Sequence, residues 1–497
     1  MTNLSDLFPA GAGKQVSFVA SGNLSNGQTV FLKSDGTVEG VQSSAGTITH
    51  DGTNAGMSLS VYADMKTDWD NNSNVLVVFS INSSNYPTIT AASVSGTTLT
   101  FGTTVVLQSV TVTDQDATMG LKHHPTSAYG LAIWGQGGSA LSVSGYSISG
   151  TSVTHQGTTT ASNYNPPVFG SAVGYQTSDN QWLIQGYNGF NGSIEVFSCS
   201  GSYSGSTPSL TNLLSTGQAF GMSSSSDSCD FAYDSTQEKM IWVCKTSTNP
   251  YVRYGIMDYN GGSFQIYSGN VGASGAAYID QVSVEYDAEA DRGIIAYNYD
   301  NANNLKVVTI DVGASSATIG TATTVISGTS YGSTQFDLSY DTLNKRTVLA
   351  YQKNDVTDQN ALVVSVDSGG STITLGTNKV LQTLGGVQAL STTYDPQNNE
   401  VLVTYWKSGN VVQTDFLSVT GTNNLANFIG ITDEAISNTA SGNVTIKGGI
   451  STNVSSLTIG SDYYVQADGS ISTTSTSPAV KIGKALSATA LNLEYTS

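Results

Sequence analysis

One phrase of the sequence recurs along most of the chain at a nearly constant interval. It reads as strand, Tyr-Asp, polar turn and strand, and it is clearest at "FDLSYDTLNKRTVLAY" (336–351). Between equivalent positions the intervals are 54, 52, 58, 53, 54 and 54 residues. Even spacing over seven copies predicts a repeat architecture. The anchor positions are Asp70, His124, Gln176, Asp234, Asp287, Asp341 and Asp395.

Each repeat contains four short segments with alternating apolar and polar residues. In the sixth repeat they are "QFDLSYD", "RTVLAYQ", "ALVVSVDS" and "STITLGTNKVLQ". Period-2 alternation between turn residues predicts antiparallel strands, and no comparable stretch has a helical period. Seven such sheets bury both faces when they pack radially. We therefore predict an all-β chain with a seven-bladed β-propeller over residues 45–425, with an open β-solenoid as the alternative.

Two segments at opposite ends of the chain resemble each other. "LSNGQTVFLKSDGTVEG" (24–40) aligns without gaps with "LTIGSDYYVQADGSIST" (457–473). The Asp-Gly pairs at 35–36 and 468–469 predict two-residue hairpins, in which both turn positions need positive φ. We therefore predict that residues 1–44 and 426–497 form one small β-domain, into which the propeller is inserted.

Charge and hydropathy exclude several classes of partner. The net charge is −19, and the 17 Lys and Arg residues form no basic patch, which argues against nucleic acid. No 18-residue apolar window predicts membrane insertion, and the N-terminus has no features of a secretory signal. The three cysteines match no zinc motif. Cys244 is predicted to be buried, and a Cys199–Cys229 disulfide is left open.

The Tyr-Asp pairs have two interpretations. An Asp before a turn can accept backbone N–H groups two residues on, while the Tyr packs between blades. We favour this structural interpretation, with Tyr340 and Tyr351 packing and Asp341 shaping the turn, because two copies lack the Asp. The alternative is a ring of carboxylates that holds cations in the channel.

Metal binding has weak candidates only. Asp68, Asp70, Asn72 and Asn74 alternate in one turn, and Asp287, Glu289 and Asp291 alternate in another, as hard cations favour. The Gly and the final Glu of an EF-hand are missing. His123 and His124 are adjacent, but His50 and His155 are the chain's only other histidines. We interpret all of these as turn and packing residues and predict neither a metal nor a cofactor.

Sugar chemistry divides into hydrolysis and binding. Hydrolysis needs two carboxylates flanking one bond, and the repeated Asp residues predict a ring rather than a pair. No Asp-box, arginine cluster or nucleophile motif is present. Loops that mix aromatics with Asn, Ser and Gly suit recognition, although inter-blade packing also uses Tyr and Trp. They are "SNYNPP", "QGYNGFNG", "CSGSYSG", "NPYVRYGIMDYNGG" and "AYNYDNANN".

The ends also resemble a known group of proteins. The head "VSFVASGNLSNGQTVFLKSDGTVEGV" and the tail, from "FIGITDEAISNTASGN" to "GKALSATALNL", are similar to structural proteins of marine tailed phages. These are described as tail-fibre, tail-appendage or virion structural proteins. The resemblance is confined to the ends. It implies a virion component that docks through a terminal module and turns its variable part outward, and it brings no catalytic residues.

We therefore hypothesise a non-enzymatic structural component of a phage virion, associated with the tail as a fibre, appendage or nozzle. The terminal domain would contact other virion proteins, and the propeller would contact a host receptor or surface glycan. A homo-oligomer is expected in the particle, although no coiled-coil heptad sets its size. A capsid decoration or passive structural protein is one alternative, and a propeller-type glycan hydrolase is the other.

Overall fold

The computed structural model describes most of residues 14–494, and its strands divide between two compact units. Within that range it leaves out 34, 42–45, 58–64, 113–118, 137–139, 163, 166–172, 189–192, 201–206, 213–227, 246–251, 261–262, 272–280, 300–303, 328–334, 354–357, 367–371, 384–386, 408–410, 421–423, 467–468 and 476–478. The described residues contain no helix long and apolar enough to cross a membrane.

The larger unit comprises Gly46–Ser365 and Gly370–Thr420, and its described strands form seven antiparallel sheets. Each sheet has an inner strand that ends at, or one residue before, the turn anchor of one repeat. The first four sheets are β5 (Met65–Asp70), β6 (Val75–Ile81), β7 (Pro87–Ser95), β8 (Thr98–Phe101) and β9 (Val105–Val106); β10 (Met119–His123), β11 (Tyr129–Gln136), β12 (Ala140–Ser149) and β13 (Ser152–Ser162); β14 (Tyr164–Asn165), β15 (Val173–Gln176), β16 (Gln181–Asn188), β17 (Ser193–Ser200) and β18 (Thr211–Asn212); and β19 (Cys229–Asp234), β20 (Lys239–Lys245), β21 (Val252–Asn260) and β22 (Ser263–Asn270).

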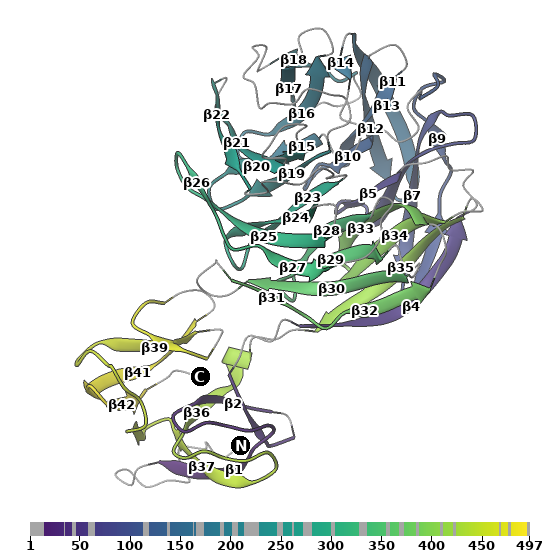
Figure 1. Ribbon diagram of the computed structural model, residues 1–497. Helices are drawn as coiled ribbons and strands as arrows, with labels where there is room; N and C mark the ends of the chain where they lie inside the picture. The colour runs from purple at the N-terminus through teal and green to yellow at the C-terminus, as the bar shows by residue number, and fades with distance from the viewer. Residues whose placement is uncertain are drawn as a thin grey trace. The chain divides into compact units, whose positions relative to one another are not determined.

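The last three sheets complete a ring. They are β23 (Val282–Asp287), β24 (Arg292–Tyr299), β25 (Asn304–Val312), β26 (Ala317–Ile319) and β27 (Thr323–Ile326); β28 (Phe336–Asp341), β29 (Arg346–Lys353), β30 (Asp358–Val366), β31 (Ile373–Leu375) and β32 (Lys379–Thr383); and β33 (Val387–Asp395), β34 (Glu400–Lys407), β35 (Val411–Thr420) and β4 (Thr47–Met57). The inner strands are β5, β10, β15, β19, β23, β28 and β33 (Figure 1). Each inner strand contacts the inner strand of the next sheet, and β33 contacts β5. The predicted β-propeller is therefore confirmed.

Apolar clusters between the blades hold the ring together. One cluster joins the first and second blades through Phe79, Trp134 and Tyr146, all of which are fully buried. Another joins the first and seventh blades around Trp69 and Phe416. Because both faces of a blade are covered by its neighbours, the second strands read as continuous apolar runs, such as "VLVVFSI" in β6, where every residue is buried.

The seventh blade takes its outer strand from the other end of the propeller sequence. Strand β4 pairs antiparallel with β35, from Thr47 opposite Thr420 to Met57 opposite Val412. Polar contacts reinforce this closure, since His50 Nε2 lies 3.0 Å from Asp415 Oδ1 and Thr53 Oγ1 donates to the same oxygen. The sequence pattern had not indicated that this strand closes the ring.

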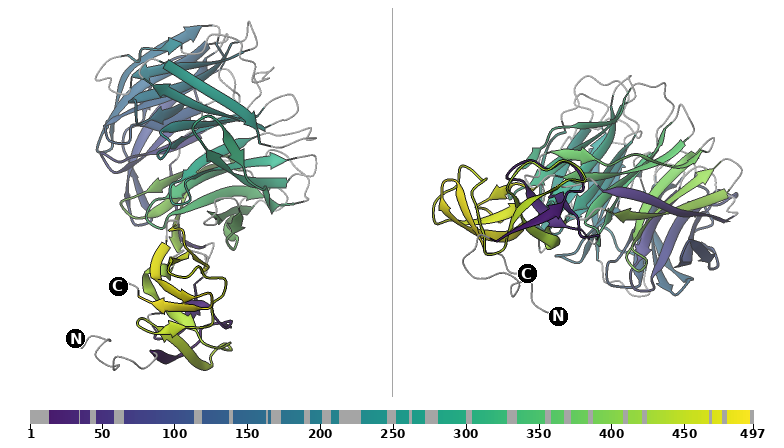
Figure 2. Two further views of the ribbon diagram at one scale, coloured as in Figure 1. Left: turned by 90° about the vertical axis from the view of Figure 1, so that its left-hand side faces the viewer. Right: turned by 90° about the horizontal axis from the view of Figure 1, so that it is seen from below.

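The smaller unit contains both ends of the chain, and its strands form two five-stranded sheets (Figure 2). A short 3-10 helix, η2 (Asn424–Asn427), precedes β36. The first sheet, here the first module, has the order β1 (Gln15–Val19), β37 (Ser441–Ile446), β36 (Phe428–Thr432), β2 (Thr29–Leu32) and β3 (Val38–Gly40). The second sheet, here the second module, has the order β38 (Ile450–Ser451), β42 (Ala490–Leu493), β41 (Ala479–Ser487), β39 (Asp462–Gln466) and β40 (Ile471–Ser472).

These two modules are copies of one motif. In chain order, β1, β2, β3, β36 and β37 occupy the same places in the first sheet as β38 to β42 occupy in the second. The pairings agree residue by residue. Val30 opposite Gly430 corresponds to Tyr463 opposite Gly483, and a β-bulge follows Val30 and Tyr463 alike. The propeller is therefore inserted between the third and fourth strands of the first module, where the second module has only residues 473–478.

The two modules differ in what their outer faces cover. Phe31, Phe428 and Ile431 on the outer face of the first sheet are buried in the core of the second module. The equivalent positions of the second sheet are Tyr464, Lys481 and Lys484, and both lysines are exposed. Two modules therefore complete the stack, because the last face is polar.

The Asp-Gly turns differ from the prediction. Gly36 and Gly469 have φ of +85° and +82°, but Asp35 does not have positive φ. Lys33 N–H donates to Thr37 O at 2.9 Å, and Gly36 N–H donates to Lys33 O at 3.0 Å. Three residues therefore separate Lys33 from its partner Thr37, and of Asp35 and Gly36 only the glycine lies in the left-handed region. Asp468 lies outside the described residues.

Candidate functional site

The repeated aspartates lie in the blade turns. Asp341 Oδ1 accepts N–H groups from Leu343 and Asn344, both at 2.9 Å, and Asp341 is fully buried. The residue four places after the Asp has positive φ in six turns, at Asn74, Asn180, Glu238, Asp291, Lys345 and Asn399. Equivalent carboxylate contacts occur at Asp70, Asp234, Asp287 and Asp395.

The two degenerate copies keep the turn by other means. His124 Nδ1 accepts the N–H of Thr126 at 3.1 Å, which is the bond that an Asp makes elsewhere. Gln176 instead donates its amide to Ser178 Oγ and Asp179 Oδ2. Neither these residues nor the turn aspartates line the axial cavity described below. The geometry therefore favours the turn interpretation over a ring of cation-binding carboxylates.

The tyrosines before the aspartates connect neighbouring blades. Tyr340 Oη accepts the N–H of Glu289, in the turn of the preceding blade, at 3.1 Å. Tyr394 makes the same contact with Leu343 at 3.3 Å. Tyr351 is also buried, and its hydroxyl donates to Asn378 Oδ1 at 2.8 Å. These side chains pack as predicted, and their hydroxyls fix the orientation of the rings.

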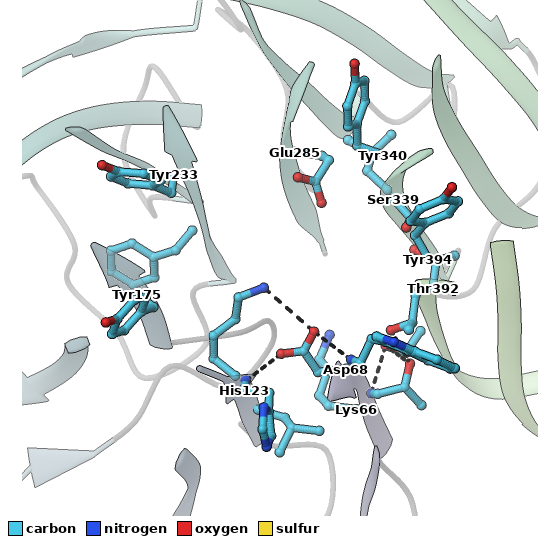
Figure 3. A pocket seen from close by; sticks show the side chains of 18 of the residues that line it. Lys66, Asp68, His123, Tyr175, Tyr233, Glu285, Ser339, Tyr340, Thr392 and Tyr394 are labelled. Atoms are coloured by element: carbon cyan, nitrogen blue, oxygen red, sulfur yellow. Dashed lines mark hydrogen bonds and ion pairs between the residues drawn. The ribbon is translucent and has the colours of Figure 1, made fainter. Parts of the chain in front are cut away.

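A cavity of about 560 Å³ lies on the propeller axis and is lined by the inner strands of all seven blades (Figure 3). Tyr175, Tyr233, Tyr340 and Tyr394 line it, together with turn residues such as Asn71 and Thr342. Its size falls within the range of small-molecule sites. The charged side chains that line it are Lys66, Asp68, Lys122, Asp230, Glu285 and Asp337.

Three of the cavity carboxylates bridge successive inner strands. Asp68 Oδ2 accepts the N–H of His123 at 2.6 Å. Asp230 Oδ2 accepts that of Val284 at 2.8 Å, and Asp337 Oδ2 accepts that of Thr392 at 2.8 Å. Each bond joins a blade to the next one, so these carboxylates combine a structural role with exposure to the cavity.

The charges in the cavity are strongly coupled. Lys122 Nζ lies 3.7 Å from Asp68 Oδ1, and the Asp68 carboxylate raises the pKa of that lysine. Ser283 Oγ lies 3.2 Å from Asp230 Oδ2 and 3.0 Å from Asp337 Oδ1. A single hydroxyl proton cannot serve both carboxylates at once. A proton on Asp230 satisfies the second contact, and burial raises the pKa of Asp230 to about 7.

Glu285 stands apart from the bridging carboxylates. It points into the cavity, and its Oε1 accepts only the N–H of the adjacent Tyr286, at 3.0 Å, among the contacts of the described residues (Figure 3). Burial raises the pKa of Glu285 to about 7, while Lys122 opposes this shift. Glu285 is therefore the carboxyl group of the cavity that is most available to a ligand.

The remaining candidates are structural. Among the described residues, no group of three or more His, Cys, Asp or Glu side chains is arranged to hold a metal ion. Asp70 and Asp287, from the two calcium candidates, accept N–H groups of their own turns. His123 is buried beside Asp70, with Nδ1 3.6 Å from Oδ1.

Other histidines and the cysteines also have packing roles. His155 Nε2 lies 3.1 Å from Thr158 Oγ1. All three cysteines are buried thiols outside any disulfide, so the disulfide left open between Cys199 and Cys229 is absent, and Cys244 is buried as predicted. Burial raises the pKa of the Cys199 thiol to about 11, which makes that thiol a poor nucleophile.

Parts of the aromatic stretches proposed for recognition lie outside the described residues, including 189–192, 201–205 and 300–303. Much of the rest belongs to strands such as β21 and β24, where Tyr254 and Tyr297 are buried in the core between two blades.

Sequence reasoning allowed for a channel on the propeller axis but missed the residues that line its cavity. A signal for it existed, because positions two and four residues before the turn anchor alternate with the apolar ones. In the fifth repeat these positions are Glu285 and Ser283.

Comparisons with known proteins give distant structural likenesses only. No family model matches the chain, and no curated protein matches it in sequence. A solved protein from Lactobacillus plantarum is 12% identical, covering 74% of this chain and 96% of its own, with a TM-score of 0.44. The N-terminal domain of Nup159 is 9% identical over 81% and 100%, with a TM-score of 0.42. The C-terminal WD40 domain of Sif2 is 9% identical over 75% and 99%, with a TM-score of 0.37. Likenesses this distant carry nothing about activity.

Proposed function

We propose that the protein is a structural component of a phage virion, associated with the tail as a fibre, appendage or nozzle. In this proposal the unit that contains both termini attaches to other virion proteins. The propeller binds a host receptor or surface glycan at its axial cavity. We further propose that it acts without catalysis and is present in several copies in the particle.

The observation that carries this proposal is that the chain divides into two compact units. The smaller unit has its own apolar cores, one around Val30, Val38 and Val444 and another around Val465 and Leu491. The segments that resemble phage structural proteins are the ones that build these cores. A module that folds around its own core and carries a large insertion suits attachment of a variable head to a shared platform.

The axial cavity supports a binding role for the head. It brings aromatic rings, hydroxyl groups and charges of both signs together on a closed ring of strands. Sites built on rigid elements hold their groups more accurately than sites on loops. Three of its four carboxylates also accept backbone N–H groups of the next blade, which favours a structural role for them over acid–base chemistry.

The hydrolase alternative retains one specific observation. Two carboxyl groups of the cavity, Asp230 and Glu285, have pKa values raised to about 7 by burial, which suits a general acid. Hydrolysis predicts the release of reducing sugars from host-surface polysaccharide and its loss in Glu285→Gln. A binding protein would release none.

Location on the particle tests the central proposal. Antibodies against the purified protein, imaged on intact virions by electron microscopy, are expected to label the tail and to reduce adsorption to host cells. Labelling of the head at high copy number, without an effect on adsorption, would favour a capsid decoration. Absence of the protein from purified particles would refute a virion role altogether.

A further inference from the structure

We infer that the axial cavity binds an uncharged sugar residue of the receptor glycan, with Glu285 and Lys122 as its principal hydrogen-bonding groups. This inference rests on the proposed function and adds to it the place and the chemical class of the ligand. Four observations lead to it, concerning charge, hydrogen-bonding capacity, the rim and size.

The charge balance disfavours acidic ligands. Two ammonium groups face four carboxyl groups in the cavity. The Asp68 carboxylate offsets Lys122, and Asp230 and Asp337 share contacts with the single hydroxyl of Ser283. Even with one proton held there, three carboxylates face two ammonium groups. The cavity therefore carries a net negative charge, which favours a neutral ligand over an acidic sugar.

The cavity also offers donors and acceptors in alternation. Lysine ammonium groups only donate, carboxylates only accept, and the hydroxyls of Ser339 and Thr393 do both. In addition, Thr392 Oγ1 and Trp69 Nε1 belong to residues that line the cavity and are 7% and 6% exposed, yet neither atom has a hydrogen-bond partner among the described residues. Buried polar atoms of this kind are normally satisfied, and sugar hydroxyls can satisfy both types.

The rim supplies apolar surface in a fixed orientation. Tyr340 and Tyr394 line the cavity while their hydroxyls bind the turns of preceding blades. Tyr175 is held in the same way, since its hydroxyl contacts His124 Nε2 at 2.7 Å. Rings that are already ordered lose little entropy when a sugar stacks on them. The cavity volume of about 560 Å³ accommodates one or two sugar rings.

Titration with defined oligosaccharides tests the inference. The full chain would be titrated calorimetrically with maltotriose, lactose and mannotriose as neutral probes, and with 3′-sialyllactose and trigalacturonic acid as acidic ones. At least one neutral probe is expected to bind at least tenfold more tightly than the acidic probes. Glu285→Ala and Lys122→Met should each weaken that binding about tenfold or more, as loss of charge-assisted hydrogen bonds predicts.

A matched control separates the cavity from the rest of the blade. Asp311→Asn changes a half-exposed acidic residue of the same blade that pairs with Arg292 across the second and third strands. It should leave binding unchanged. Binding that survives both cavity variants, or a preference for the acidic probes, would overturn the inference.

The result is also separable from the proposed function. If none of the probes binds but antibodies still label the tail, the ligand class is wrong and the virion role stands. If the protein is absent from the particle, the proposed function fails, whatever the cavity binds.

Discussion

Both units of this protein are built by repetition, but they repeat different things. In the smaller unit, the two modules share the same pairing of strands. Val30 opposite Gly430 in the first module corresponds to Tyr463 opposite Gly483 in the second, and a bulge follows in both. The propeller repeats a turn, whereas its cavity-facing positions change from blade to blade. Asp68, Lys122 and Glu285 occupy the same place in three blades. Repetition thus preserves the strand pairing in one unit, whereas in the other it leaves the cavity-facing side chains free to differ between blades.

The largest test of this comparison is removal of the propeller. Residues 46–423 would be replaced by "TTSTSP", the connection that the second module uses at 473–478. We expect a folded all-β protein with a cooperative thermal transition, measured by circular dichroism and calorimetry.

In the full chain, Leu491→Ala should lower the temperature of one of two calorimetric transitions, because Leu491 is fully buried in the second module. A single transition that shifts as a whole would show that the units do not fold independently.

A matched pair of glycines tests how the modules pack. Gly27 and Gly460 occupy equivalent positions with φ of +75° and +80°. A Cβ at Gly27 would lie 2.0 Å from Asn453 O, whereas one at Gly460 would meet nothing within 4 Å. Gly460→Ala should cost about 1 kcal/mol for its backbone conformation, and Gly27→Ala about 3 kcal/mol. Urea unfolding measures both, and equal costs would contradict the packing.

The turn interpretation predicts a loss of stability without a loss of binding. Asp341→Ala removes the acceptor of three N–H groups, two from backbone and one from Asn344 Nδ2 at 2.8 Å. We expect a loss of about 2 kcal/mol in the free energy of unfolding, with unchanged affinity for any probe that the wild-type protein binds. Asp311→Ala serves as the control, because the Asp311 side chain is half exposed. Weaker binding at unchanged stability would revive the carboxylate ring.

The cavity predicts an unusual dependence of stability on pH. The pKa values of Asp230 and Glu285 are raised by burial to about 7, above their ordinary values near 4. Between these values the folded state binds more protons than the unfolded state, so stability falls as the pH rises from about 4 to 7. Glu285→Gln should flatten this decline by on the order of 1 kcal/mol, measured by urea unfolding at pH 5 and pH 8. A steeper decline would contradict the assignment.

The smallest expected effect is a gain in stability rather than a loss. Glu238 holds the positive-φ position of its turn with φ of +56°, a conformation that glycine adopts without strain. Glu238→Gly should therefore stabilise the propeller by up to about 1 kcal/mol, whereas Asn74→Gly should gain less because Asn tolerates this conformation. Thermal melting compares the two variants.

The sequence revealed what is local and repeated. The Tyr-Asp turns and the glycines at 36 and 469 are short signals, and they led to the propeller and to the resemblance between the two terminal segments. The full duplication was hidden because the propeller separates β3 from β36, so only its Asp-Gly hairpins aligned. Strand β4 was missed for a similar reason, since its partner β35 lies at the far end of the propeller.

The cavity was missed because its residues differ among the repeats. Lys122 and Glu285 attract no attention in a search for similarity, although the alternation of the inner strand places both on the axis. The turn type at Asp35 was predicted incorrectly because the dipeptide suits both two-residue and three-residue connections. Neighbouring pairings decide between them, and here Lys33 bonds to Thr37.

The closing strand also constrains the order of events during synthesis. His50 and Asp415 are separated by 365 positions. The outer strand of the seventh blade, β4, therefore stays without its partner β35 until almost the whole propeller has left the ribosome. The first module waits even longer, for β36 and β37, whereas the second module is contiguous. Long-range pairings of this kind form late and slowly. The growing chain therefore carries its N-terminal strands unpaired through most of translation. The propeller can close only once β35 has emerged, and the first module only once β36 and β37 have followed.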